Sequence, residues 1–204
     1  MNGGKVPLPG SERHPVGTRV GPAQQNAVIE VSIILKPKKA VVIAPTGGPY
    51  LTREEFAAAH SADAVAIDKV KEFAQAHGLT VTEVLPVRRT VKLSGTVGQL
   101  SKALSVQLDH YTHNRLPYRA RTGSIELPGE LADSIEAVLG LDNRPQAKAH
   151  LRVLGQEDRA RAANISYTPV QVAQIYQFPT GVDGTGHAIG IIELGGGYST
   201  TDLT

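Results

Sequence analysis

One acidic residue near the end of the chain lies where a fold of strands and helices would place a functional group. Ala188 to Leu194 is an apolar run of strand length that contains the single acid Glu193 and is followed by Gly195-Gly196-Gly197. Continuous apolar strands are typical of parallel sheets covered on both faces, and the carboxyl ends of such strands carry functional groups. Glu193 is therefore a candidate site residue. The alternative interpretation is an acid that merely caps a loop.

Two glycine-rich stretches in the same region raise the alternative of nucleotide binding, and their context argues against it. Gly184-x-Gly186-x-x-x-Gly190 precedes the apolar run, whereas the glycines of a dinucleotide-binding loop follow a strand and open a helix. Gly195-Gly196-Gly197 does follow the run, but it lacks the Lys-Ser/Thr pair of a phosphate-binding loop. We therefore expect no nucleotide cofactor.

A helix is predicted just before the apolar run. Thr168 can cap orphan N–H groups, Pro169 suits the first helical turn, and Pro179 with Gly181 would stop the helix. Its apolar face would consist of Val170, Val172, Ala173 and Tyr176. A helix followed by a buried parallel strand indicates the start of a second domain, which we expect to be incomplete at Thr204.

The composition excludes several classes of function. The 204 residues leave room for one ordinary domain and part of another, and a hydrophobic content of 41% is typical of a globular chain. A net charge of +2 and a chain without Trp argue against nucleic acid as a partner, and the apolar runs are too short to span a membrane. The absence of cysteine excludes disulfides, thiolate catalysis and thiolate metal sites.

The two flanks of the upstream region differ from its middle. Met1 to Gln25 is rich in Gly and Pro and lacks the apolar segment of a secretory signal, so we predict a flexible N-terminal arm over residues 1–26. Asn143 to Ser166 is rich in charged residues and shows no sustained period, which predicts a solvated linker. An ordered domain is therefore expected between them.

Alternation of apolar and polar residues, bounded by turn residues, predicts the strands of this domain. They are expected at Ala27–Leu35, Leu79–Leu85, Thr90–Ser94 and His110–His113, and Tyr118–Leu127 is expected to be extended. The second and third strands would form a hairpin around residues 86–89, because Pro86 and the basic residues after it favour a turn.

Capping signals predict the helices. Thr52-x-x-Glu55 is a capping box that starts a short helix, and Thr96-x-x-Gln99 is a second one. Ser61 can cap a further helix, which would bury Ala66, Ile67, Val70, Phe73 and Ala74 and end at Gly78. The helix after Thr96 would bury Val97, Leu100, Leu104 and Leu108, and a last helix after Pro128 would bury Leu131, Ile135, Val138 and Leu139. The order strand, helix, strand, strand, helix, strand is that of a ferredoxin-like fold.

Both parts of the chain resemble the sedolisin family of serine-carboxyl peptidases. The C-terminal part resembles the start of the mature enzyme through Ala162-Ala163, Tyr167-Thr168-Pro169, Val172-Ala173-Gln174, Tyr176-Gln177-Phe178-Pro179, Gly181, Asp183-Gly184, Gly186 and Ile191 to Tyr198. The upstream part resembles the family's activation prodomain through Leu51 to Phe56, His77-Gly78-Leu79, Gly123-x-Ile125-x-Leu127-Pro128 and Gly140-Leu141-Asp142. The resemblance covers nearly the whole chain.

The resemblance implies an α+β fold in several parts. Residues 1–26 would be the arm, 27–143 the activation domain, 144–161 a processing linker and 162–204 the N-terminal segment of the catalytic domain. The activation domain would be a ferredoxin-like open-faced sandwich, an antiparallel sheet with two main helices. The last part would be the incomplete start of a subtilisin-like α/β domain.

The resemblance also implies a parent enzyme, an acid-active serine endopeptidase precursor with a Ser-Glu-Asp triad. A Glu base, with an ordinary pKa of about 4.3, stays partly ionised at acid pH where a His base would be protonated. The triad and a calcium site would lie beyond Thr204, so we expect this chain alone to hold no catalytic residue and no cofactor.

Three further assignments rest on the resemblance alone. Glu193 would belong to a hydrogen-bond network linked to the triad. The mature enzyme would begin at Ala162, which makes Arg161–Ala162 the processing bond. A possible first cleavage region comprises His150, Leu151 and Arg152.

As partners, the resemblance implies the chain's own catalytic domain and, for the parent, protein or peptide substrates outside the cell. The prodomain would act as an intramolecular chaperone and an inhibitor released at low pH, with the linker removed by autoproteolysis. Protonation of the six histidines before Ala162, or of interface carboxylates, could drive the release. The alternative is a stand-alone ferredoxin-like module that binds a ligand or protein, with residues 162–204 as an unrelated tail.

Overall fold

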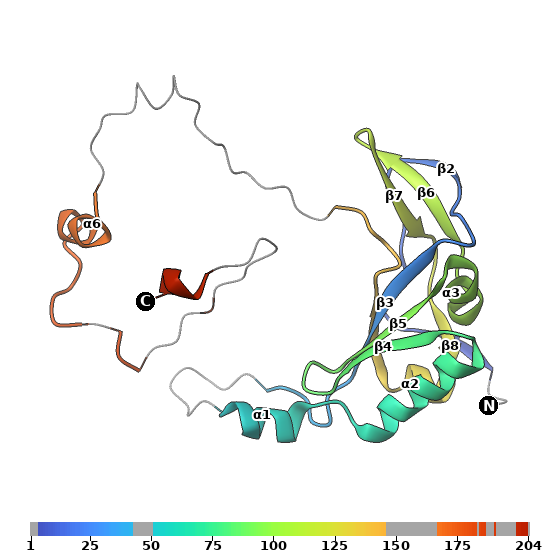
Figure 1. Cartoon of the computed structure of the whole chain (residues 1–204), viewed down its shortest axis with the longest axis horizontal. Helices are drawn as coiled ribbons and strands as arrows, with labels where there is room; N and C mark the ends of the chain where they lie inside the picture. Colours follow the sequence, from blue (N-terminus) through green and yellow to red (C-terminus); the bar gives the residue numbers. More distant parts are fainter. Residues whose placement is uncertain are drawn as a thin grey trace. The chain divides into compact units, whose positions relative to one another are not determined.

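The computed structural model of the chain describes residues 4–42, 51–145, 167–182, 184–186, 190 and 199–203. The chain divides into two units, residues 1–149 and residues 150–204. Figure 1 shows the elements of both units, coloured along the sequence.

In the described part of the chain, all nine strands and four of the helices belong to the first unit. The strands are β1 (Lys5–Pro7), β2 (Thr18–Pro22), β3 (Val28–Leu35), β4 (Thr80–Leu85), β5 (Thr90–Thr96), β6 (Leu108–His113), β7 (Leu116–Arg121), β8 (Glu126–Pro128) and β9 (Ile135–Leu139). The helices are α1 (Arg53–His60), α2 (Ala64–Ala76), α3 (Val97–Leu104) and α4 (Gly129–Ala132). The second unit contains α6 (Pro169–Ile175) and a 3₁₀ helix, η1 (Thr200–Leu203).

A four-stranded antiparallel sheet forms the centre of the first unit. Its strand order is β4-β5-β3-β9, and β3, β4 and β5 run side by side in Figure 1. The predicted hairpin is confirmed as β4 and β5. Val31 of β3 pairs with Leu93 of β5, and Ile33 pairs with Val138 of β9. This register aligns the apolar side chains of the strands on one face of the sheet.

Helices α2 and α3 bury that face. The main core cluster joins Val31, Ile33, Leu35, Val91 and Leu93 of the sheet to Val70 and Phe73 of α2 and Leu100 and Leu104 of α3. All of these side chains are at most 2% exposed. Burial of a large apolar side chain stabilises the folded state by about 1.5–3 kcal/mol, so this cluster holds the unit together.

Both predicted capping boxes are confirmed. The Thr52 hydroxyl accepts from the N–H of Glu55, whose carboxylate accepts in return from the N–H of Thr52. Thr96 and Gln99 make the same pair of bonds at the start of α3. Each box satisfies two N–H groups that have no partner inside the helix, and so fixes where the helix begins.

The predicted cap of α2 is wrong by two residues. The carboxylate of Asp63, not the hydroxyl of Ser61, accepts from the N–H of Val65 at 2.8 Å. Ser61 instead ends α1, where its hydroxyl donates to the carbonyl of Ala57. Gly78 follows α2 with φ of +65°, a left-handed conformation that ends the helix as predicted.

The predicted helix from Pro128 through Leu139 is also wrong. Helix α4 is a single turn, and Ile135–Leu139 forms strand β9. The helical spacing of Leu131, Ile135 and Val138 suggested a helix. Strand β3, however, offers β9 a ladder of main-chain partners, and tertiary pairing of this kind overrides local periodicity.

A second sheet has the order β2-β6-β7 and is antiparallel. The predicted strand at His110–His113 is β6, but it begins at Leu108, which we had expected in a helix. Helix α3 ends at Leu104 because Ser105 takes a left-handed φ of +53°. The segment predicted to be extended, Tyr118–Leu127, contributes to β7 and β8.

The N-terminal segment differs from the flexible arm predicted over residues 1–26. Strand β1 pairs with β8 and β2 pairs with β6, while Leu8 and Ala23 belong to the main core cluster. The Lys5 ammonium donates to the carbonyl of Lys102 at 3.1 Å, at the end of α3. The Gly and Pro residues of this segment suggested an irregular arm. The strands form because their pairing partners lie far along the chain, and such pairing leaves no local pattern in the sequence.

The described part of the second unit contains the helix that the sequence predicts, α6. The Thr168 hydroxyl accepts from the N–H of Gln171, and Pro169 occupies the first turn of α6. No residue of α6 is buried. The strand predicted over Ala188–Leu194 lies outside the described residues.

Candidate docking surface

The face of the four-stranded sheet opposite to α2 and α3 is covered by none of the described helices. Glu30, Ser32 and Ile34 alternate with the buried residues of β3 and therefore point to this face. The register places Lys92 of β5 beside Ser32. We call this surface the open face, and its residues are Glu30, Ser32, Ile34, Glu83, Thr90, Lys92, Ser94 and Leu139.

A network of charged side chains crosses the open face. The Lys92 ammonium lies 2.8 Å from a carboxylate oxygen of Glu83 and 3.9 Å from one of Glu30. The hydroxyl of Thr82 donates to Glu30 at 2.8 Å. The hydrogen bond to Glu83 raises the pKa of Lys92. These side chains are one-third to one-half exposed, so the network links three strands while staying in contact with water.

This arrangement suits a surface that binds another protein reversibly. Interfaces of proteins that also exist apart are about as polar as the rest of the surface, and complementary charges set their orientation. Ile34 and Leu139 add apolar area among the charges, and Leu139 is 54% exposed.

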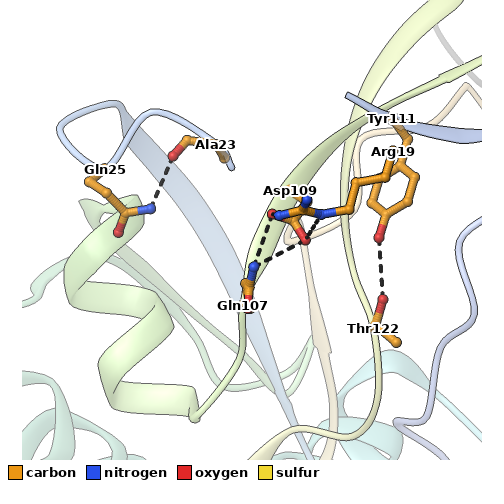
Figure 2. A network of polar contacts seen from close by, with 7 residues as sticks. All are labelled: Arg19, Ala23, Gln25, Gln107, Asp109, Tyr111 and Thr122. Atoms are coloured by element: carbon orange, nitrogen blue, oxygen red, sulfur yellow. Dashed lines mark hydrogen bonds and ion pairs between the residues drawn. The ribbon is translucent and has the colours of Figure 1, made fainter. Parts of the chain in front are cut away.

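The three-stranded sheet holds a second polar network, which joins β2 to β6. Figure 2 shows the Arg19 guanidinium of β2 facing the Asp109 carboxylate of β6, with donor distances of 2.9 and 2.8 Å. The amide of Gln107 donates to the same carboxylate at 3.2 Å. Hydrogen bonding from Arg19 lowers the pKa of Asp109, against the opposing effect of burial. Asp109 is 6% exposed, so the pair joins β2 to β6 rather than forming a ligand site.

Two tyrosines complete this internal support. The rings of Tyr111 and Tyr118 stack with their centroids 5.7 Å apart. The Tyr111 hydroxyl lies 3.3 Å from that of Thr122, as Figure 2 shows, and the Tyr118 hydroxyl donates to the carbonyl of Val16. Side chains of the small sheet thus help to hold its strands together.

Helix α6 and the residues just after it differ from the first unit's core helices α2 and α3, because their apolar side chains are exposed to solvent. Val170, Ile175, Tyr176 and Phe178 are between 59% and 74% exposed. Clustered apolar side chains of this size on one short element mark a surface that packs against a partner. In the described part of the second unit, that partner is absent.

Comparison with known protein families now identifies the chain. Residues 15–144 match the family described as "Pro-kumamolisin, activation domain". The chain is 40% identical over 199 residues, 90% of its length, to kumamolisin of Bacillus sp. (strain MN-32). The chain belongs to the Pro-kumamolisin activation-domain family. It therefore contains the prodomain of a sedolisin-type peptidase precursor, as the resemblance implied.

Two more distant relatives agree with this assignment of the activation domain. The chain is 29% identical over 167 residues to xanthomonalisin of Xanthomonas sp. (strain T-22) and 26% identical over 153 residues to sedolisin of Pseudomonas sp. (strain 101). These matches cover 76% and 73% of the chain. The matches span 36% of kumamolisin, 20% of xanthomonalisin and 26% of sedolisin, so the chain corresponds to about a third or less of each relative.

The site residues predicted from the sequence lie outside the described residues. They are Glu193, Arg161, Ala162, His150, Leu151 and Arg152. The described part of the structure therefore contains none of them. What it adds is the open face and the Arg19–Asp109 pair, neither of which the sequence reasoning singled out. A signal existed for the open face: Glu30, Ser32 and Lys92 occupy the polar positions of alternating strands.

The described histidines of the activation domain occupy helix ends and surface positions. A ring nitrogen of His60 lies 2.8 Å from the carbonyl of Lys39, and one of His77 lies 2.9 Å from that of Phe73. His14 lies 3.5 Å from Glu12 at the surface. Among the described residues, no group of three or more His, Asp or Glu could hold a metal ion. A search of the same residues finds no helix long and apolar enough to cross a membrane.

Proposed function

We propose that residues 15–144 act as the intramolecular chaperone and inhibitor of an acid-active serine endopeptidase encoded in the same precursor. The observation that carries this proposal is the match to the activation-domain family over these residues. The open face supports it, because the sheet presents a polar, charge-ordered surface that no described helix covers. The peptidase portion is the partner that we place on it.

We infer that the core of this prodomain is ferredoxin-like. The chain order β3-α2-β4-β5-α3-β9 and the spatial order β4-β5-β3-β9 support that inference, because they are the two orders that define a split βαβ sandwich. The small sheet, β8 and α4 would then be an insertion between α3 and β9. We further propose that residues 162–204 open a subtilisin-like α/β domain in which Glu193 joins a network linked to the triad.

We propose that the linker, residues 144–161, is removed by autoproteolysis. Arg161–Ala162 would be the final processing bond, and the region of His150, Leu151 and Arg152 the first to be cut. N-terminal sequencing of the mature peptidase, purified after activation of the full precursor, tests this directly. A mature N-terminus at Ala162 supports the assignment, and one within residues 170–204 contradicts it.

We propose that acid weakens the contact between prodomain and peptidase. Carboxylates in general take up protons in acid, so an interface that is oriented by ion pairs weakens there. Loss of this order would loosen a partner seated on the open face. We also propose that the parent acts on proteins outside the cell, and that its triad and calcium site belong to the remainder of the precursor.

Binding of the chain to a mature peptidase tests the proposed function. The 204-residue chain is titrated onto immobilised mature kumamolisin at pH 7 and at about pH 4, and inhibition is measured in parallel. We expect saturable binding and inhibition at the higher pH and weaker binding in acid. The informative variant is Ser32→Glu, which places a bulkier, charged side chain in the centre of the open face. We expect it to weaken binding about tenfold, as for a residue near the centre of an interface.

The matched control is Gln75→Glu, which adds the same charge on the exposed side of α2 and should leave binding unchanged. Equal effects of the two variants would contradict docking through the open face. Failure of the unmodified chain to bind or inhibit would contradict the inhibitor assignment. That result would favour the alternative of a stand-alone binding module.

A further inference from the structure

A cavity lined by arginines lies where β9 leads into the linker. Its volume is about 340 Å³, and its charged lining residues are Arg13, Arg121, Asp142 and Arg144. Of these, Arg13 and Arg121 come from segments far apart in the sequence. Leu139 lines the same cavity and belongs to the open face, so the cavity adjoins the candidate docking surface.

Arg13 and Arg121 donate their hydrogen bonds to neutral groups. Arg121 is only 5% exposed, and its guanidinium donates to the main-chain carbonyls of Ser11 and Gly123. Arg13 likewise donates to two carbonyls, those of Gly10 and Glu12. Within the described residues, neither arginine forms an ion pair, since the ion pairs there involve other groups.

The contrast with the other arginines of the unit is informative. Arg19 is held by the carboxylate of Asp109, and Arg89 by that of Glu136. Arg121 is more deeply buried than either, and a buried charge is costly unless an opposite charge accompanies it. Burial, and to a smaller extent the nearby charge of Arg13, lower the pKa of Arg121, while the charge of Asp142 acts in the opposite direction.

The wall of the cavity is fixed in place before any ligand arrives. The Arg119 guanidinium donates to the carbonyls of Gly140 at 2.9 Å and Leu141 at 3.1 Å. Gly140 has φ of +96°, and a Cβ there would lie 2.7 Å from the carbonyl oxygen of Glu30, so only glycine fits this turn. One carboxylate oxygen of Asp142 accepts from the N–H of Arg144 at 2.8 Å, which closes the turn.

We propose that this arginine cavity is a carboxylate-binding site, and that in the precursor an Asp or Glu side chain of the peptidase portion occupies it. The assignment of a peptidase side chain as the occupant rests on the proposed function, whereas the assignment of a carboxylate-binding site does not. Guanidinium groups bind carboxylates through paired, charge-assisted hydrogen bonds, and a bound carboxylate would neutralise the charge that Arg13 and Arg121 bring together. A partner seated on the open face reaches the cavity past Leu139.

The first arm of the test uses the 204-residue chain and succinate as the carboxylate probe. Arginine Nε–H and main-chain amide resonances of ¹⁵N-labelled chain are followed during titration, against sodium chloride of equal ionic strength. We expect saturable shifts of Arg121 and Gly140 with a Kd of about 1 mM, the range for a small ligand of few atoms. Arg13→Gln should raise the Kd for succinate about tenfold, because the variant loses a charge-assisted hydrogen bond to the carboxylate.

The matched control for this arm is Arg53→Gln, an exposed arginine of α1 outside the cavity, which should leave the Kd unchanged. Arg13 is itself exposed, so its replacement should leave the fold intact, and an unchanged amide spectrum away from the cavity checks this. Shifts that equal those of chloride, or equal effects of the two variants, would overturn the carboxylate site.

The second arm separates a protein carboxylate from a small one. Binding to mature kumamolisin is compared for Arg13→Glu and the control Arg53→Glu. We expect the first to weaken binding more than tenfold and the second to have little effect. If succinate binds but the two variants bind kumamolisin equally, the occupant is a small carboxylate. The assignment of a peptidase side chain to the cavity is then overturned. If the unmodified chain fails to bind kumamolisin, the proposed function fails while the first arm still decides the cavity.

Discussion

Helices α3 and α6 begin in the same way and end in opposite environments. Each starts with a threonine capping box, Thr96 with Gln99 and Thr168 with Gln171. Helix α3 buries half of its residues, Val97, Leu100, Ala103 and Leu104, whereas α6 buries none. The comparison teaches that local signals decide where a helix begins, and that its burial depends on partners supplied from elsewhere in the chain.

The same contrast separates the two units. The first unit has a continuous core, and several of its charges are paired or hydrogen-bonded internally. The described part of the second unit exposes the apolar face of α6. We interpret the first unit as a folding unit with its own core, whereas the described helix of the second unit buries no residue. Three predictions test this comparison.

The largest expected effect comes from truncating one apolar side chain in each helix. Leu100→Ala should lower the free energy of unfolding by about 2–5 kcal/mol, because Leu100 is fully buried and its loss leaves a cavity. Val170→Ala should change it by less than about 0.5 kcal/mol, because Val170 is 67% exposed. Urea unfolding followed by circular dichroism measures both. A loss above 1 kcal/mol for the α6 variant would show that this helix packs on the core.

A smaller effect is expected from removing the two caps. Thr96→Ala should cost about 1 kcal/mol, because two N–H groups at the start of a core helix lose their acceptors. Thr168→Ala removes the same bonds from α6 and should leave global unfolding unchanged while lowering local helicity. The same unfolding assay measures the first effect, and Cα chemical shifts of residues 169–175 measure the second. Equal losses of stability for Thr96→Ala and Thr168→Ala would contradict the difference between the two helices.

The smallest effect concerns pH and the internal pair of the small sheet. Because Arg19 lowers the pKa of Asp109 in the folded state, the pair contributes stability that is present above the unfolded value of about 3.9 and is lost as the pH falls through the folded value. Asp109→Asn should therefore reduce stability at pH 7 and make the acid limb of the stability profile shallower. The loss should stay below that of Leu100→Ala, since Arg19 is half exposed and screened by water. An unchanged acid limb, measured by thermal unfolding from pH 7 to 3, would contradict this.

Much of the fold follows from local sequence signals. The capping boxes at Thr52 and Thr96 and the threonine cap at Thr168 predicted three helix starts correctly, and Gly78 ends α2 as expected. Alternation along Val28–Leu35 revealed β3 and its buried face. These features succeed because the physical cause, a side chain or a period, lies within a few residues.

The errors share the opposite cause. Ile135–Leu139 becomes a strand because β3 offers it an edge about 100 residues earlier in the chain, and β2 forms because β6 lies beside it. Leu108 continued the apolar spacing of α3, but the turn at Ser105 breaks the helix before it. Pairing between distant segments leaves no trace in a local window.

The parts of the candidate site differ in how far the sequence predicts them. The family followed from motifs in the sequence and agrees with the match over residues 15–144. The processing bond and Glu193 stay predictions. The open face could have been anticipated from the polar positions of β3 and β5. The arginine cavity could not, because Arg13, Arg121 and Asp142 meet only through the folded path of the chain.

Hydrogen exchange of the main-chain amides in the 204-residue chain tests the central claim most directly. We predict that amides of β3, β5 and α3 exchange only through global unfolding, with a common free energy of opening, and that amides of α6 exchange nearly as fast as in an unstructured peptide. Strong protection of α6 in this chain, equal to that of α3, would contradict the claim that the first unit has a core of its own while α6 is exposed.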